Sequence, residues 1–300
     1  SVVYSGTGTI DLSAISTHNG DVLANSDVDL NRVIYQSASA DDGSALASVV
    51  IGGDVAISGV AVANGAGTAI SSGASADVGM DALVYQSVSA DSGSALAVAS
   101  IATGVAVDVN LAAGAADTGS AEADASAAFD SYVLYQSAQA DDGDAGVAFV
   151  NNGALSISLA ADAAADGGSA SATASFTSTV FYQYASVSGE GDASVSFVND
   201  GTLNISGVAN AAGASFASAE ATFDDYLVSA SAQADDGTAF VEFRNDGTLA
   251  VAMTANALAT AGDATAVAIK SSGADGMIDL SASATSASGD SAVVAEFTNA

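Results

Sequence analysis

Acidic pairs recur along the chain, each directly before a glycine: Asp41-Asp42, Asp141-Asp142 and Asp235-Asp236, with Asp91 and Glu190 in matching places. Carboxylate oxygens are ligands for Ca²⁺, which takes six to eight of them. The glycine-rich nonapeptide of Ca²⁺-binding β-rolls is absent. The pairs therefore predict either solvated acidic turns or weak Ca²⁺ sites between successive turns, and no other cofactor is expected.

Tyrosines recur with the same regularity. The phrase VIYQSASADDG (33–43) returns as LVYQSVSADSG (83–93) and VLYQSAQADDG (133–143), so Tyr35 and its two counterparts are 50 residues apart. One interpretation is a column of aromatic rings that braces a stack. The other is an exposed stripe on which carbohydrate packs. The phenylalanines at 149, 197, 243 and 297 alternate with apolar neighbours and are expected in the core.

Few residues could perform catalysis. The chain has three basic residues in unrelated repeats, and His18 is its sole histidine. A lyase acting on acidic glycans needs basic side chains to hold its substrate and stabilise developing negative charge. Pairs of carboxylates for a hydrolase arise by chance among 35 acids. We expect no enzyme, and a glycan-active β-helix enzyme is the third-ranked alternative.

The composition excludes several partners. The formal net charge is −32, and nucleic acid or an anionic membrane requires a basic patch that is missing. A mean hydropathy of +0.41 argues against disorder. No apolar run reaches the ~18–20 residues of a membrane helix, so no membrane insertion is expected. The lack of cysteine removes disulfides and thiolate chemistry.

Short alternating stretches flank the turns. In DASVSFVNDGTLNISGVANA (192–211), Val195 and Phe197 share one face, and Leu203 and Ile205 do so after Asn-Asp-Gly. This pattern predicts strand–turn–strand units. Glycines recur along the chain at regular intervals, at positions 20, 43, 67, 93, 119, 143, 168, 191, 213, 237, 262 and 289. The first and the last are 269 residues apart, so the mean of the 11 intervals is about 24.5 residues.

The predicted fold is all-β: a parallel β-solenoid (β-helix) of about 12 coils of about 24–25 residues, paired into a two-coil repeat of about 50. Residues 1–300 would form one continuous rod of roughly 58 Å without separate domains, at ~4.8 Å per coil. Acidic pairs in alternate coils would lie ~9.6 Å apart, which lowers their repulsion. A meander or outer-membrane barrel is the alternative, although the expected aromatic girdles are missing.

The phrase FVNDGTLNISGVANA and its variants resemble the β-solenoid repeats of large secreted bacterial surface proteins, such as autotransporter passengers and filamentous adhesins. YQSxSADDGSALA is more distantly similar to curli-type fibre subunits, although glutamines recur only in every second predicted coil. The resemblance implies an extracellular or cell-surface structural protein that forms part of a bacterial fibre, with a role in biofilms. The alternative is the rigid stalk of an adhesin whose ligand-binding domain lies elsewhere.

The predicted partners are copies of the same chain and cations. Tyr4 and Phe297 fall at nearly the same phase of the repeat, so the chain would span a whole number of coils. Open sheet edges at each end would then let copies stack head to tail. Continuation of the solenoid within a longer polypeptide would give the same local arrangement.

Overall fold

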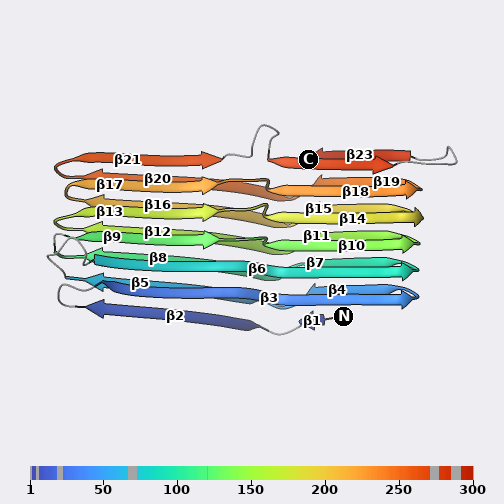
Figure 1. The fold of residues 1–300 in the computed structure, drawn as a ribbon, viewed down its shortest axis with the longest axis horizontal. Coiled ribbons are helices and arrows are strands. Elements are labelled where there is room, and N and C mark those ends of the chain that lie inside the picture. The colour runs from blue at the N-terminus through green and yellow to red at the C-terminus, as the bar shows by residue number, and fades with distance from the viewer. Residues whose placement is uncertain are drawn as a thin grey trace.

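The computed structural model describes residues 2–4, 7–18, 23–66, 73–119, 121–270, 277–284 and 292–299. These residues form 23 β-strands in three sheets, and the paired strands are parallel (Figure 1). The described residues contain no helix, and hence none that is long and apolar enough to cross a membrane. The prediction of an all-β fold with parallel strands is confirmed.

The three sheets have seven, six and ten strands. The seven-stranded sheet comprises β1 (Val2–Tyr4), β4 (Ala45–Ile51), β7 (Ala95–Ile101), β11 (Ala145–Asn151), β15 (Ala193–Asn199), β19 (Thr238–Asn245) and β23 (Ala292–Asn299). The six-stranded sheet comprises β2 (Gly8–His18), β5 (Val55–Gly65), β8 (Ala106–Asp117), β12 (Ala154–Ala165), β16 (Thr202–Gly213) and β20 (Thr248–Ala259). The ten-stranded sheet comprises β3 (Ala24–Asp42), β6 (Gly73–Ser92), β9 (Glu122–Phe129), β10 (Leu134–Asp142), β13 (Ser169–Phe176), β14 (Phe181–Glu190), β17 (Phe216–Phe223), β18 (Val228–Asp236), β21 (Asp263–Lys270) and β22 (Ile278–Ala284).

Strands form because side chains alternate between the core and the outside. In β12, Leu155, Ile157 and Leu159 are buried, whereas Ser156 and Ser158 point outward. Successive side chains of a strand point to opposite faces, so this sequence can bury one face of a sheet and leave the other in water.

The chain visits the three sheets in a fixed order. A long strand of the ten-stranded sheet, such as β6, is followed by β7 in the seven-stranded sheet and β8 in the six-stranded sheet before the chain returns. In later passes two shorter strands, such as β13 and β14, replace the long strand. We call one such pass a circuit, and each circuit extends all three sheets by one strand position (Figure 1).

The repeating unit of the stack is about 50 residues, so the prediction of about 12 coils of 24–25 residues is wrong. Gln86 donates to Gln36, which is 50 residues earlier, and Asn199 donates to Asn245, which is 46 residues later. Asn245 and Asn299 are 54 residues apart. The glycine spacing of about 24.5 residues marks chain reversals instead: Gly143 lies at one end of a circuit, and Gly168 at the other.

The molecule is also shorter along the stack than the predicted rod of roughly 58 Å, because it has half as many levels. Strand β6 has 20 residues and spans ~66 Å, whereas six strands stacked at ~4.8 Å span only ~29 Å. The long axis of the chain therefore lies along the strands rather than along the stack (Figure 1). The ten-stranded sheet forms one layer, and the other two sheets pack against its two halves as the second layer.

The core between the layers is thin and built mostly from alanine and valine. Phenylalanines fill its wider parts as columns: Phe149, Phe197 and Phe243 are buried, and the rings of Phe197 and Phe243 stack with centroids 5.2 Å apart. Their predicted place in the core is confirmed. Phe297 extends this column but is 58% exposed, because β23 is the last strand of its sheet.

Two columns of amides cross the circuits, and six of their eight members are buried. Gln36, Gln86, Gln136 and Gln183 form a ladder of side-chain hydrogen bonds, each 2.8 Å long. Asn151, Asn199, Asn245 and Asn299 form another, with bonds of 2.6–2.7 Å. The circuit is twice as long as the predicted coil. These glutamines therefore occupy consecutive circuits, and the predicted coils without a glutamine between them do not exist.

Candidate functional site

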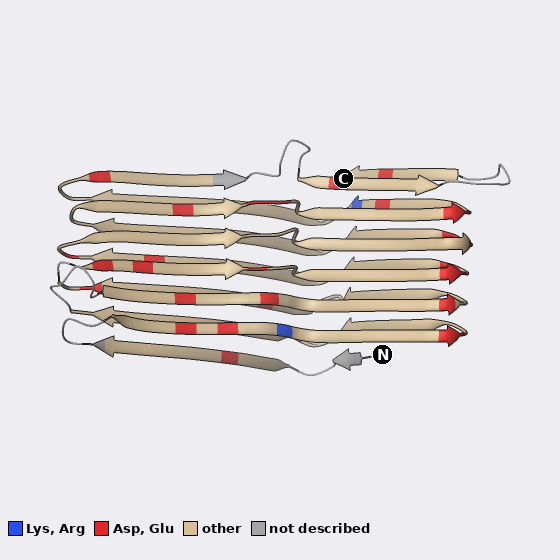
Figure 2. Ribbon diagram, in the orientation of Figure 1, with Lys and Arg blue, Asp and Glu red and all other residues tan. Residues whose placement is uncertain are grey.

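The acidic turns gather at one end of the circuits, where strands of the ten-stranded sheet turn into the seven-stranded sheet (Figure 2). Ser92 is in register with both Asp42 and Asp142, and Glu190 is in register with Asp236. The turns therefore stack in consecutive circuits at one strand spacing of ~4.8 Å. The prediction that alternate coils separate these charges by ~9.6 Å is wrong.

Close stacking of these turns depends on glycine. Gly143 has a φ of 103°, in the region that side chains rarely adopt. A Cβ atom on Gly143 would lie 2.8 Å from the backbone carbonyl of Gly93 in the preceding circuit. Glycine thus lets each turn lie directly on the one before it.

Hydroxyl and amide donors separate several carboxylates in this column. The Ser92 hydroxyl donates to the backbone oxygen of Asp41 (3.3 Å), and the Ser188 hydroxyl donates to Asp141 Oδ1 (3.0 Å). One residue beyond the turn, Asp144 Oδ1 accepts the backbone N–H of Asp192 (3.0 Å). The last two contacts reach carboxylate oxygens and offset part of their negative charge by hydrogen bonding rather than by ion pairing.

The structure does not assemble a ready-made metal centre. Across the described ranges, no three histidine, cysteine, aspartate or glutamate side chains come together in a position to hold a metal ion. Ca²⁺ at the six predicted residues therefore stays a prediction; these are Asp41, Asp42, Asp141, Asp142, Asp235 and Asp236. Any such site would draw ligands from adjacent circuits and from water.

A second acidic patch was not predicted. It surrounds a cavity of ≈310 Å³ on the ten-stranded sheet and includes Asp27, Asp29, Asp77, Asp81 and Asp130. Partial burial, followed by the negative charges of Asp77, Asp81 and Asp29, raises the pKa of Asp130. Register brings these residues together, and the 50-residue interval between Asp27 and Asp77 is the signal that could have found them.

The tyrosines form a continuous column on the outer face of the ten-stranded sheet. Ring centroids of Tyr35 and Tyr85 are 5.3 Å apart, those of Tyr85 and Tyr135 4.4 Å, and those of Tyr135 and Tyr182 5.3 Å, with interplanar angles of 8–17°. The Arg32 guanidinium lies 4.3 Å from the centroid of the Tyr85 ring. Burial raises the pKa of both Tyr135 and Tyr182.

This geometry favours bracing over carbohydrate stacking. Each ring covers the face of its neighbour, and mainly edges and hydroxyl groups are left for solvent. Carbohydrate packs on ring faces, because the faces carry the negative π density that attracts C–H and cationic groups. Although Tyr35 is 56% exposed, the column as a whole offers ring edges.

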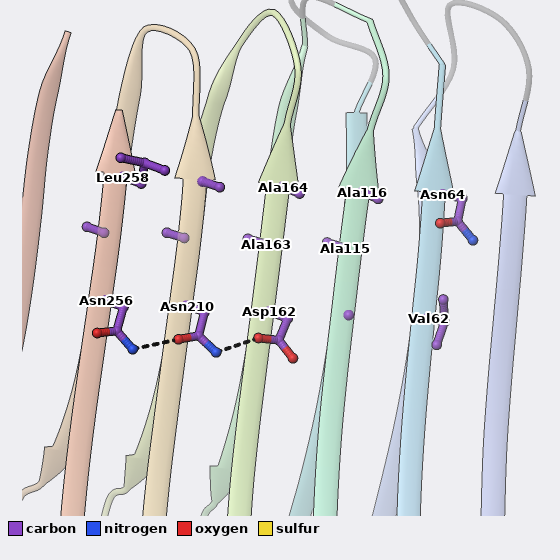
Figure 3. A pocket seen from close by; sticks show the side chains of 14 residues that line it. Val62, Asn64, Ala115, Ala116, Asp162, Ala163, Ala164, Asn210, Asn256 and Leu258 are labelled. Carbon is purple, nitrogen blue, oxygen red and sulfur yellow. Dashed lines mark hydrogen bonds between the residues drawn. The ribbon is translucent and has the colours of Figure 1, made fainter. Parts of the chain in front are cut away.

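A shallow groove crosses the outer face of the six-stranded sheet (Figure 3). Its volume is ≈580 Å³, and alanine side chains from β8, β12 and β16, together with the backbone of Gly114, line its floor. Asn256 Nδ2 donates to Asn210 Oδ1 (2.9 Å), and Asn210 Nδ2 donates to Asp162 Oδ1 (2.7 Å) along one side. Sequence reasoning missed this groove because small residues give no pattern until the register is known.

Some sequence features lie outside the described residues: the side chain of His18 and the turn glycines Gly20, Gly67 and Gly289. Comparison of the chain with protein-family models, curated proteins and solved structures finds no match.

Proposed function

We propose that the protein is an extracellular structural component of a bacterial surface fibre, in which the circuits are coils of a parallel β-solenoid. One observation carries this proposal: identical side chains stack through successive circuits, as Gln86 does on Gln136 and Phe197 on Phe243. In ladders of this kind each circuit presents the same side chains as the one before it, so the next circuit can pack on it in the same way.

Assembly would proceed through the two ends of the stack. β1, β2 and β3 at one end, and β20 to β23 at the other, each pair with a neighbouring strand on one side only. An unpaired strand edge is a template for another strand. We propose that a second copy of the chain, or further coils of the same polypeptide, pairs with these edges and covers Phe297.

The surface location is part of the same proposal. It is supported by the resemblance to secreted bacterial surface repeats and by a net charge of −32, which keeps a repetitive β-protein soluble. With about six stacked strands in ~29 Å, the net charge of −32 amounts to one charge per ~0.9 Å of stack. Cations are therefore the proposed small partners, with Ca²⁺ at the acidic turns as the specific case.

The proposal is tested by electron microscopy and fibre diffraction of the purified chain at micromolar concentration. We expect filaments with a reflection near 4.8 Å along the filament axis. Phe297→Asp should abolish them, because it places a charge where the next layer must pack, while the separate chain stays folded. Discrete particles from wild-type protein at all concentrations would favour the adhesin stalk. Hydrolysis of a glycan by the purified chain would favour the enzyme.

The cation partner has its own test. We expect the melting temperature to rise with NaCl concentration, since salt screens the stacked acids. At matched ionic strength, Ca²⁺ should raise it further and EDTA should reverse that increment if the turns hold the ion. A melting temperature that does not change with ionic strength would show that repulsion between the stacked acids does not limit stability.

A further inference from the structure

Five of the eight tyrosines gather in one cluster on the ten-stranded sheet. Four of them form the stacked column described above, and Tyr132 leans against it. The Tyr132 ring is tilted by 51° against Tyr135 of its own circuit, with centroids 5.2 Å apart. It is tilted by 45° against Tyr182 of the next circuit, with centroids 5.4 Å apart. Every circuit from the first tyrosine of the column to the last is thus in ring contact with its neighbour.

Tyrosine is the side chain of this protein that most readily gives up a single electron. Cysteine and tryptophan, which compete with it for oxidants, are absent from the sequence. Of the three methionines, Met80 is fully buried. A tyrosine that loses one electron and its phenolic proton becomes a phenoxyl radical, whose unpaired electron lies partly on the ring carbons ortho to the oxygen. One-electron oxidation of this chain is therefore expected to produce tyrosyl radicals.

The column is accessible from solvent along its edge. Tyr35 is 56% exposed, and Tyr85, Tyr135 and Tyr182 are half-buried. Stacking covers the ring faces, so water reaches mainly the ring edges and the hydroxyl groups. These are the atoms from which the phenolic proton leaves and at which two tyrosyl radicals combine.

We propose that the tyrosine column is a site of oxidative cross-linking, at which tyrosines of consecutive circuits are joined as dityrosine. The oxidant is hydrogen peroxide, acting through a haem peroxidase. Each of two tyrosines loses one electron and its phenolic proton, and the two radicals form a carbon–carbon bond between their ortho positions. The two ortho hydrogens then move to the oxygens as protons through water, which restores both phenols. The two electrons and the two phenolic protons reduce one molecule of hydrogen peroxide to two of water.

Tyr85 and Tyr135 are the best-placed pair. They are in register on adjacent strands, and their rings are the closest in the column, with centroids 4.4 Å apart and planes 8° from parallel. Side chains of a strand stand roughly perpendicular to the sheet, so the two Cβ–Cγ bonds run side by side. Rotation of each ring about this bond turns two stacked faces into two facing edges and brings the ortho carbons together. The strands stay at one spacing of ~4.8 Å throughout.

Such a bond would tie consecutive circuits together covalently. Tyr85 and Tyr135 are 50 residues apart, so the bond closes a loop of one whole circuit. A covalent cross-link of this length restricts the unfolded chain as a disulfide does, and we expect the melting temperature to rise by about 5–10 °C.

The cross-link belongs to the single chain. Beyond Tyr182 the column continues as Ser229 and Asp279, which are in register with it. Copies that stack end to end in the same register would therefore place Asp279 against Tyr35 of the next copy, and no tyrosine pair would form across the junction. The inference thus needs no second copy and stands apart from the proposed function.

The test treats the dilute full chain with a haem peroxidase and hydrogen peroxide and measures dityrosine by its fluorescence. Tyr85→Phe combined with Tyr182→Phe removes one hydroxyl from every described ring pair that joins two circuits, while phenylalanine keeps the rings stacked. Tyr184→Phe combined with Tyr226→Phe is the matched control, since it also leaves six of the eight tyrosines. Tyr184 has serines in register on both sides. We expect the first variant to form at least three-fold less dityrosine than the wild type, and the control to match the wild type.

Peptide mapping of the oxidised wild type locates the bond. Digestion at aspartate should release one linked pair of peptides that contains Tyr85 and Tyr135, and denaturing electrophoresis should show a single chain. Thermal melts before the reaction establish that the variants are folded, and melts after it measure the expected rise. The proposal is overturned if the wild type forms no dityrosine, if the two double variants form equal amounts, or if the bonds join separate chains. A melting temperature that the cross-link leaves unchanged would also overturn it.

Discussion

The phrase YQSAQADD places two different polar columns on one strand, β10, and the two are stabilised differently. Gln136 belongs to the buried column, where its Nε2 donates to Gln86 Oε1 (2.8 Å) and to the carbonyl oxygen of Ala148 across the core (3.0 Å). Asp141 and Asp142 belong to the turn column, which faces solvent. An amide carries both donor and acceptor, so identical amides can stack at every layer; carboxylates only accept, so identical carboxylates repel.

The chain reflects this difference. The glutamine column is uninterrupted from Gln36 to Gln183. In the turn column Ser92 lies between Asp42 and Asp142, and Ser188 donates to Asp141. Where the amide column ends, at Ala230 in the next circuit, Gln183 Oε1 is left buried without a hydrogen-bond partner. Stacking is thus favourable inside a ladder and costly at its end.

The largest effect is expected from breaking the amide column in its middle. Gln136→Leu leaves Gln86 Oε1 and the Ala148 carbonyl without the Gln136 donor, and deprives Gln183 Nε2 of its acceptor. An unsatisfied buried polar group costs about 1–3 kcal/mol, so we expect a loss of about 3–5 kcal/mol. Urea unfolding followed by circular dichroism measures this. A loss below about 1 kcal/mol would contradict the role of the ladder.

The matched variant lies at the end of the same column. Gln183→Leu removes the unpartnered Gln183 Oε1 and leaves Gln136 Oε1 without a donor instead. One orphan acceptor replaces another, so the expected loss is about 1 kcal/mol, mainly from the hydrogen bond to the Ser196 carbonyl. Equal losses from Gln183→Leu and Gln136→Leu would show that continuity of the column is unimportant.

A smaller effect is expected when the turn column is made continuous. Ser92→Asp places a third aspartate in register between Asp42 and Asp142, and like charges on adjacent strands destabilise by about 0.2–1 kcal/mol per pair. The loss should shrink at high salt, because these turns are exposed. Ser92→Asn, which adds similar bulk without charge, is the control. Salt-independent loss in Ser92→Asp would point to a steric cause.

The smallest effect concerns the acidic patch on the ten-stranded sheet. The pKa of Asp130 is raised above its ordinary value of 3.8, so the folded chain binds a proton there more readily than the unfolded chain. Lowering the pH from neutral through the raised pKa therefore favours the fold, and this gain is complete below 3.8. We expect the melting temperature of the wild type to rise more over this range than that of Asp130→Asn. Identical pH profiles would exclude Asp130 as the source.

Sequence patterns predicted the strands and their parallel stacking because alternation and repeated phrases report directly on both. They misled about the period because Gly143 and Gly168 both mark reversals, and each circuit contains two of them. Turn spacing alone cannot tell half a circuit from a whole one. The recurrence of Gln86 and Gln136 at 50 residues could have done so, since side chains in a ladder must match their stacking partners.

The site was predicted less completely. The acidic turns were found because their residues are adjacent in the sequence. The cavity around Asp77 and Asp130 was missed because its residues come from different circuits, and the groove on the six-stranded sheet was missed because small residues line it. Both the cavity and the groove depend on which residues are in register between circuits. The spacing of residues along the sequence reveals that register only after the true period is known.

The 46–54-residue separation of stacked partners also governs how the molecule can form. Among the described strands there is no hairpin, so no two strands can pair in a sheet before a whole circuit has closed. Closing such long loops before any pairing is gained makes the first circuit slow to nucleate. Once it exists, each later circuit meets a preformed edge. Refolding should therefore show a lag that preformed, sonicated stacks shorten by seeding.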